Sequence, residues 1–272
     1  MTRLLNIVGA GKVGRTLGRL LAGGGAFVLQ DVLTRSAASA AEAIAFMGAG
    51  QAAASADAMR RADVWLLAVG DDQIGPVCAS LAARALLDGA IVFHCSGAHA
   101  SSVLASAAAA GASTASVHPV RSFADPDQVA AGFGGTFCGV EGDSAALALL
   151  VPAFEAIGAR TVVIDAAAKT VYHAASVFAS NYLVTVLDAA LRAYQAAGIA
   201  EPVARALAAP LAQEAMDNVF RLGAPAALTG PIARGDVATV ARQQGALDAW
   251  DDPSGALYRA LALATSALAA RR

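Results

Sequence analysis

The chain has 272 residues, of which 57% are hydrophobic and 15% are charged, and its formal net charge is −2. This length allows one large domain or two smaller ones, either of which can bury a substantial core. The small net charge without a basic cluster excludes an electrostatic surface for nucleic acid or anionic lipid, and the lack of any run of about 18 strongly apolar residues predicts a soluble cytoplasmic protein with no membrane partner.

Short apolar runs alternate with helix-length segments from residue 4 to residue 164. This alternation is typical of a doubly wound, mostly parallel β-sheet covered by helices. The expected strands are 5–8, 27–33, 64–69, 90–94, 115–117, 136–140 and 161–164. The pattern predicts an α/β domain over residues 1–165.

After residue 165 the strand pattern stops and helical patterns follow. Residues 166–197 contain neither proline nor glycine and predict one long helix. Because many of its residues are apolar, we expect this helix to be mostly buried. Further helices are expected at 202–222, 236–250 and 254–270. We therefore expect an all-α domain over residues 166–272 that binds substrate, and its alanine-rich helix faces favour a homodimer.

A glycine-rich loop follows the first expected strand directly. It reads Gly9-Ala10-Gly11-Lys12-Val13-Gly14 and leads into a helical pattern. In this context Gly9 permits a tight turn, Gly11 lets the backbone approach a pyrophosphate, and Gly14 lets the helix pack on the strand. The helix N-terminus then faces the phosphates, so the loop, Lys12 and Val13 included, predicts the dinucleotide site of a Rossmann domain.

The end of the second strand should select the dinucleotide. NAD-specific Rossmann folds usually carry an acidic residue there that binds the ribose hydroxyls. This chain has Thr34-Arg35-Ser36 instead, and a guanidinium with a hydroxyl suits the 2′-phosphate of NADP(H). Asp31 is the alternative ribose ligand if the strand ends earlier.

Two further loops should border the cofactor, because ligands of such sheets bind outside the carboxyl ends of the strands. The third strand ends in Val69-Gly70, where the nearby Asp72 suits a cap of the next helix. The fourth strand runs into Ser96-Gly97, which we expect beside the nicotinamide or the substrate.

Histidines cluster at this same edge. His94, His99 and His118 could converge, but no acid or cysteine stands at a recognised metal-ligand spacing, so we predict no metal site. His118 and Arg121 are expected to bind substrate, with Arg121 pairing either with a substrate carboxylate or in a structural ion pair.

The long helix carries a polar stripe. At 100° per residue, Lys169, His173, Ser176 and Ser180 share one face, and Asn181 flanks it. Hydride transfer at a carbonyl or imine needs a proton partner, which a lysine or histidine on a rigid helix can supply. Lys169 and His173 are therefore the candidate catalytic residues, with a structural role the alternative for each, and Ser176 and Asn181 are candidate substrate ligands.

Several motifs resemble a known family. They are the glycine loop, Arg35-Ser36, His118-Pro119, the segments 169–175 and 181–182, and the segments 227–231 and 234–236. The chain resembles proteins that combine a Rossmann-like domain with the domain of unknown function 2520, and its helical half is similar to that of 6-phosphogluconate and β-hydroxyacid dehydrogenases. The resemblance implies an NADP oxidoreductase, and Lys169 matches the proton-donating lysine of β-hydroxyacid dehydrogenases, whereas His173 replaces their asparagine.

The predicted function is hydride transfer to or from a small polar, anionic metabolite. A relative of prephenate dehydrogenase or pyrroline-5-carboxylate reductase is a close alternative. A non-catalytic NADP-binding sensor or scaffold is the alternative from another class, for which Arg35 would matter and Lys169 and His173 would not.

Overall fold

The computed structural model describes residues 3–271. The chain divides into two compact units, residues 1–180 and 181–272. The division falls within a continuous helical run, whereas the sequence pattern places it at residue 165, where that run begins.

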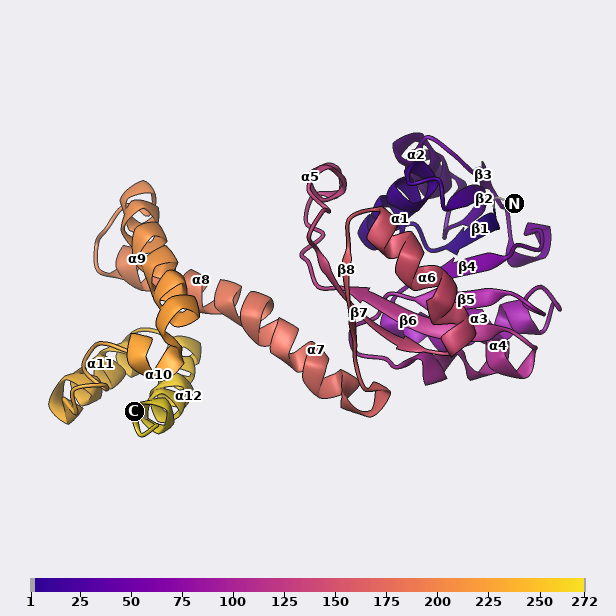
Figure 1. Cartoon of the computed structure of the whole chain (residues 1–272). Helices are drawn as coiled ribbons and strands as arrows, with labels where there is room; N and C mark the ends of the chain where they lie inside the picture. Colours follow the sequence, from indigo (N-terminus) through magenta and orange to yellow (C-terminus); the bar gives the residue numbers. More distant parts are fainter. Residues whose placement is uncertain (1–2, 272) are drawn as a thin grey trace. The chain divides into compact units, whose positions relative to one another are not determined.

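The first unit is built on an eight-stranded sheet in the order β3-β2-β1-β4-β5-β6-β7-β8 (Figure 1). Every neighbouring pair is parallel except β6 and β7. The strands are β1 (Arg3–Val8), β2 (Phe27–Leu33), β3 (Gln51–Ala52), β4 (Val64–Leu67), β5 (Ile91–His94), β6 (Ser113–Pro119), β7 (Phe137–Gly142) and β8 (Arg160–Val163). The predicted Rossmann-like α/β fold is confirmed, and the short strand β3 is an addition to it.

Helices cover both faces of the sheet, which is why its central strands are apolar on both sides. One hydrophobic cluster joins the sheet to α1, α2, α5 and α6, and a second joins it to α3 and α4. The helices are α1 (Lys12–Gly23), α2 (Ala37–Met47), α3 (Asp71–Ala82), α4 (Ala105–Ala109), α5 (Pro126–Ala131) and α6 (Ser144–Ala156). The carboxyl ends of β1, β2, β4, β5 and β6 therefore form one shared edge.

A single helical run follows β8, as predicted. It starts with a 3-10 turn at Ala166–Ala168, continues as α7 (Lys169–Val177), passes through a π-helical turn at Phe178–Tyr182 and ends as α8 (Leu183–Ala196). The expectation that this helix is mostly buried is wrong: Val171, for example, is 75% exposed, because the chain's own packing leaves this face uncovered.

By length and composition, the run 166–196 is also apolar enough to cross a membrane, with a mean hydropathy of 1.4. Alanine contributes much of that value, and core helices of water-soluble proteins reach it too. This measure alone is therefore weak evidence of a membrane span.

The second unit is helical throughout its regular structure. Beside α8 it contains α9 (Glu201–Leu222), α10 (Ala224–Ala227), α11 (Val237–Trp250) and α12 (Asp252–Ala269). Gly223 ends α9, as predicted, and Asp236 and Asp251 accept backbone hydrogen bonds that begin α11 and α12. The three long helices predicted here are confirmed, and the short helix α10 was not predicted.

Candidate functional site

The glycine loop joins β1 to α1 at the carboxyl edge of the sheet. Gly9 has a φ of +86°, and a Cβ there would lie 2.5 Å from the carbonyl oxygen of Ala68. A Cβ on Gly14 would collide with the carbonyl oxygen of Gly9, whereas Gly11 faces open space. The first turn of α1 has no side-chain cap and no acidic residue. The free N–H groups of this turn, Lys12 and Val13 included, fit a pyrophosphate.

The end of β2 separates the two candidate ribose ligands. Asp31 is 4% exposed, and its carboxylate accepts hydrogen bonds from the guanidinium of Arg60 at 2.6 Å and from the Arg60 backbone N–H at 2.7 Å. Because Arg60 already binds this carboxylate, Asp31 is not free to bind a ribose. Arg35 is exposed at the strand end itself.

The residues around Arg35 form the start of α2. Ser36 is the N-cap of α2, and its hydroxyl oxygen lies 3.2 Å from the backbone nitrogen of Ser39 and 3.0 Å from the Ser39 hydroxyl. Thr34 donates its hydroxyl to the carbonyl of Ser36 at 2.7 Å. The start of α2 thus carries two serine hydroxyls next to the exposed Arg35 in sequence, and this set of groups fits a phosphate monoester.

The ends of β4 and β5 follow along the same edge. Val69 and Gly70 lead into α3, and Gly70 is the N-cap of that helix. The predicted capping role of Asp72 is wrong, because Asp72 lies within the first turn, where it receives a hydrogen bond from Gln73 instead. Its negative charge still interacts favourably with the positive N-terminal end of the α3 dipole.

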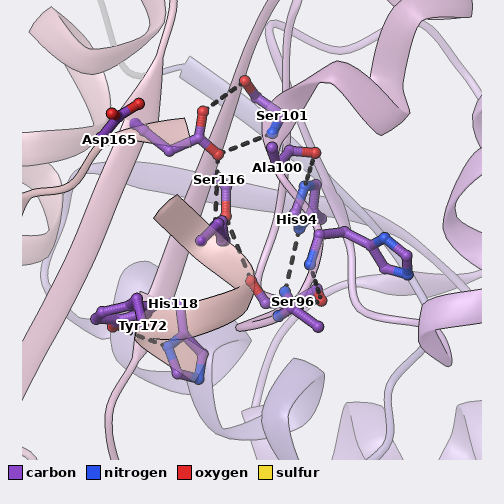
Figure 2. Close-up of polar contacts among 12 residues, drawn as sticks. His94, Ser96, Ala100, Ser101, Ser116, His118, Asp165 and Tyr172 are labelled. Atoms are coloured by element: carbon purple, nitrogen blue, oxygen red, sulfur yellow. Dashed lines mark hydrogen bonds and ion pairs between the residues drawn. The ribbon is translucent and has the colours of Figure 1, made fainter. Parts of the chain in front are cut away.

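Residues 94–101 after β5 form a tightly bonded loop (Figure 2). Nδ1 of His94 accepts the backbone N–H of Ser96 at 3.1 Å, and its Nε2 lies 3.3 Å from the carbonyl oxygen of Ala100. The Ser96 hydroxyl accepts the backbone N–H groups of Ala98 and His99. Burial, reinforced by the Lys169 charge, lowers the pKa of His94 to about 4, so its ring is neutral and serves the loop.

A buried ion pair ties this loop to α7. Lys169 is 1% exposed, and its ammonium lies 3.4 Å from the carboxylate of Glu141 on β7 and donates to the hydroxyl of Ser116 on β6. Glu141 also accepts the Ser101 backbone N–H at 2.8 Å and the Ser101 hydroxyl at 2.7 Å. Burial lowers the pKa of Lys169, and the carboxylate of Glu141 opposes that shift.

Two histidines meet beside Gly97. A Cβ on Gly97 would collide with Nδ1 of His173 on α7 and would lie 2.7 Å from Nε2 of His118 on β6. The two imidazole rings lie 5.6 Å apart at 81°. Nδ1 of His173 is buried and is the one buried side-chain nitrogen or oxygen without a hydrogen-bond partner in residues 3–271. An unpartnered buried nitrogen is unfavourable and calls for a partner, either a ligand or an ordered water.

Tyr172 holds His118 from its other side. The phenol oxygen lies 3.0 Å from Nδ1 of His118, and the two rings meet edge to face (Figure 2). Burial, together with His173 and the Lys169 charge, lowers the pKa of His118 to about 4, against the opposing charge of Asp71. His118 is therefore neutral at pH 7.

Other predicted residues do not join this group. Arg121 donates to the carbonyl oxygen of Gly132 and to the hydroxyl of Thr136 at 3.2 Å, within its own part of the chain. Ser176 is half-buried on α7, and Asn181 belongs to the second unit. Within residues 3–271 no group of three or more His, Cys, Asp or Glu side chains is placed to hold a metal ion.

Glu141 and Tyr172 were not predicted. Glu141 is the charged residue of the otherwise apolar strand β7, and a buried carboxylate requires a partner. That rule identifies Glu141 as unusual, but its pairing with Lys169 depends on the antiparallel register of β6 and β7, which sets Glu141 opposite Ser116. Tyr172 stands between Lys169 and His173 in sequence and carries no signal of its own.

A separate cavity of about 620 Å³ opens far from these histidines in sequence, among the ends of α1, α2, α5 and α6. The charged residues that line it, Arg19 and Asp127, pair with each other at 2.9 Å. This cavity offers no reactive group, so the candidate site is the carboxyl edge of the sheet.

The comparisons with known proteins agree with this geometry. Residues 2–119 match the model of a Rossmann-like domain, and residues 136–265 match that of the domain of unknown function DUF2520. The fold thus defines the Rossmann-like class, and the two family models match successive parts of the chain. No curated protein matches the chain.

Solved structures extend the likeness over the whole chain. Protein TM1727 from Thermotoga maritima is 28% identical over 98% of this chain and 100% of its own, with a TM-score of 0.74. The candidate NADP oxidoreductase BF3122 from Bacteroides fragilis is 18% identical, covers 97% of this chain and 98% of its own, and has a TM-score of 0.79. Plasmodium falciparum pyrroline carboxylate reductase with NADP bound is 13% identical over 98% of both chains, with a TM-score of 0.58.

Proposed function

We propose that this protein is a cytoplasmic NADP-dependent oxidoreductase that transfers a hydride to or from a small polar metabolite. One observation carries the proposal: the glycine loop, the Arg35 cluster and the paired histidines His118 and His173 belong to one edge of one sheet or to the helix bonded to it. A dinucleotide site beside a proton-exchanging group is the arrangement that hydride transfer needs. The three free cysteines suit a reducing compartment.

The cofactor assignment rests on the fit of the residues present. The space at Gly11 and the uncapped first turn of α1 would hold the pyrophosphate. Arg35, Ser36 and Ser39 would hold the 2′-phosphate, and Asp31, bound to Arg60, would not oppose it. When bound, NADP(H) supplies or accepts the hydride.

The histidines beside Gly97 would handle the substrate. His118, neutral at pH 7, can form a hydrogen bond to the substrate, and the unpartnered Nδ1 of His173 can give or take the proton that accompanies the hydride. The anionic character predicted for the substrate depends on Arg121, whose guanidinium would have to leave Gly132 and Thr136 to bind a carboxylate.

Lys169 has a different role in this proposal. Its ammonium is buried between Ser116 and Glu141, so it is a positioning residue that anchors α7 and thereby places His173 over Gly97. In this proposal His173, and not Lys169, acts as the acid or base.

The deciding experiment compares NADPH binding with NADPH turnover in His173→Ala. Binding measured by fluorescence or calorimetry should stay within about twofold, while turnover of a carbonyl or imine substrate panel falls about 100-fold or more. Unchanged turnover would reject His173 as the proton partner. A wild type that binds NADPH and turns over no compound of the panel would favour the sensor alternative.

We also propose that two copies associate through the second unit. The two hydrophobic clusters found in residues 3–271 lie between Leu5 and Ala159, so the second unit has no comparable core. Its exposed large apolar side chains include Val203, Leu207, Leu211, Phe220 and Leu263, with Phe220 88% exposed. Exposed large apolar side chains can serve an interface between copies, and a symmetric pair would bury the same faces of both. A monomeric mass by light scattering would refute this association.

A further inference from the structure

The contact between Tyr172 and His118 bears on the chemistry of the site. Only one side-chain nitrogen of His118, Nε2, borders Gly97, and the other, Nδ1, lies 3.0 Å from the Tyr172 phenol oxygen. A neutral imidazole carries its proton on one nitrogen, and the hydrogen bond made by the other nitrogen selects which one. The direction of the Tyr172 bond therefore decides whether His118 donates or accepts at Gly97.

The surroundings of the phenol settle that direction. A phenol has one proton to donate, and among residues 3–271 Nδ1 of His118 is the one acceptor recorded for it. A phenol O–H is a stronger donor than an imidazole N–H, and an unprotonated imidazole nitrogen is a stronger acceptor than a phenol oxygen. The favoured hydrogen bond therefore runs from the phenol to Nδ1.

The protonation state of the phenol supports the same direction. The phenol oxygen lies over Gly139, where a Cβ would approach it to 2.5 Å. Burial raises the pKa of Tyr172, which keeps the phenol protonated and able to donate to His118.

We propose that Tyr172 is a positioning residue that holds His118 as the Nε2–H tautomer, so that the site presents a neutral hydrogen-bond donor beside Gly97. Such a donor binds a hydrogen-bond acceptor, such as a carbonyl oxygen. We therefore infer that the substrate is a carbonyl compound and the product its alcohol, or the reverse. A protonated imine carries an N–H at the reacting nitrogen, which would oppose the Nε2–H. This substrate class rests on the proposed oxidoreductase function, whereas the tautomer does not.

His173 completes the arrangement. Its unpartnered Nδ1 borders the same point beside Gly97 as Nε2 of His118. One nitrogen can polarise the carbonyl oxygen while the other exchanges its proton. A neutral imidazole donor is known to polarise carbonyl groups in enzymes, as in triosephosphate isomerase.

The test is nitrogen NMR of the histidine rings at pH 7, with NADP(H) absent. The chain has four histidines, so His118→Asn assigns the His118 signals by difference. We expect Nδ1 of His118 to show the shift of an unprotonated nitrogen and Nε2 that of a protonated one. The opposite pattern, with the proton on Nδ1, would overturn the proposal whatever the enzyme activity.

A matched pair of variants tests the role of Tyr172. Tyr172→Phe should lower the His118 tautomer ratio about fivefold, which corresponds to one hydrogen bond of about 1 kcal/mol. Tyr258→Phe, which removes a phenol bonded to Gln243 in the second unit, should leave the ratio unchanged. An unchanged ratio in Tyr172→Phe would show that the tyrosine does not select the tautomer.

A substrate panel tests the class separately. Carbonyl compounds should be reduced with NADPH and cyclic imines should not. Turnover of imines alone would overturn the substrate class and keep the oxidoreductase function, and turnover of neither would reject that function while the NMR result still decides the tautomer.

Discussion

Nδ1 of His173 lies against the α-carbon of Gly97, so close that no side chain fits between them. His118 crowds the same position from β6. Because glycine has no side chain, residue 97 leaves room for both imidazole rings.

Gly97→Ala should move one or both rings. The added methyl group would lie 2.7 Å from Nε2 of His118 and would collide with His173, and a displacement of about 1 Å can reduce turnover about 100-fold. NADPH binding should change much less, because the phosphate-binding groups lie on other loops. Gly134→Ala, where a Cβ meets nothing within 4 Å, is the matched control. Equal activity of both variants would contradict the crowding.

Arg35→Ala should weaken NADPH much more than NADH. A charge-assisted hydrogen bond contributes about 1.5–3 kcal/mol, so the dissociation constant for NADPH should rise about 10-fold to 100-fold and that for NADH should stay within about twofold. Calorimetric titration of both cofactors measures this. Arg3→Ala, an exposed arginine at the amino end of β1, should change neither. Equal weakening of both cofactors by Arg35→Ala would remove the basis for NADP preference.

Breaking the buried pair of Lys169 and Glu141 should strongly destabilise the protein. Glu141→Gln leaves a buried ammonium without its counter-charge, and such a loss typically costs about 3–5 kcal/mol of unfolding free energy. Lys169→Met should cost less, because Glu141 keeps both hydrogen bonds from Ser101. Urea unfolding of the single variants and of the double variant measures the coupling between the two residues.

An exposed ion pair provides the control for that measurement. Glu201 and Arg205 are four residues apart on α9, with oxygen and nitrogen 2.6 Å apart. Glu201→Gln should change the unfolding free energy by less than about 1 kcal/mol. An equally small effect of Glu141→Gln on the unfolding free energy would show that burial does not make the loss of this ion pair more costly.

The sequence was informative where the signal is local. The glycine loop, the helix end at Gly223 and the strands of the parallel sheet follow from residue type and spacing, and the structure confirms them. The sequence did not predict that Glu141 pairs with Lys169. That pairing depends on the antiparallel register of β7 and β6, which local patterns do not show. Asp31 likewise looked available until its pairing with Arg60, on the segment before β4, was visible.

The polar stripe on the long helix was predicted only in part. Periodicity places Lys169, His173 and Ser176 on one face, but it cannot give their depth. Lys169 is fully buried, His173 borders Gly97 and Ser176 is half-buried. The difference arises because Lys169, at the start of α7, inserts into the sheet through Ser116 and Glu141, whereas later turns do not make these contacts.

Acid should destabilise the protein through two histidines. Burial lowers the pKa values of His94 and His118 to about 4 from an ordinary value of 6.5. Above pH 6.5 both the folded and unfolded states hold these rings neutral, so their full stability is present. As the pH falls from 6.5 to 4 the unfolded chain takes up protons that the folded chain refuses, and each ring loses up to about 3 kcal/mol.

Unfolding free energies measured by urea at pH 7 and pH 4.5 test this acid dependence. Carboxylates also titrate in this range, so the informative quantity is the difference between the wild type and His94→Asn/His118→Asn. The double variant should lose several kcal/mol less than the wild type on acidification, although its stability at pH 7 will be lower. His99→Asn keeps both buried rings and should retain the wild-type dependence. Parallel pH profiles for the wild type and the double variant would show that neither ring resists protonation.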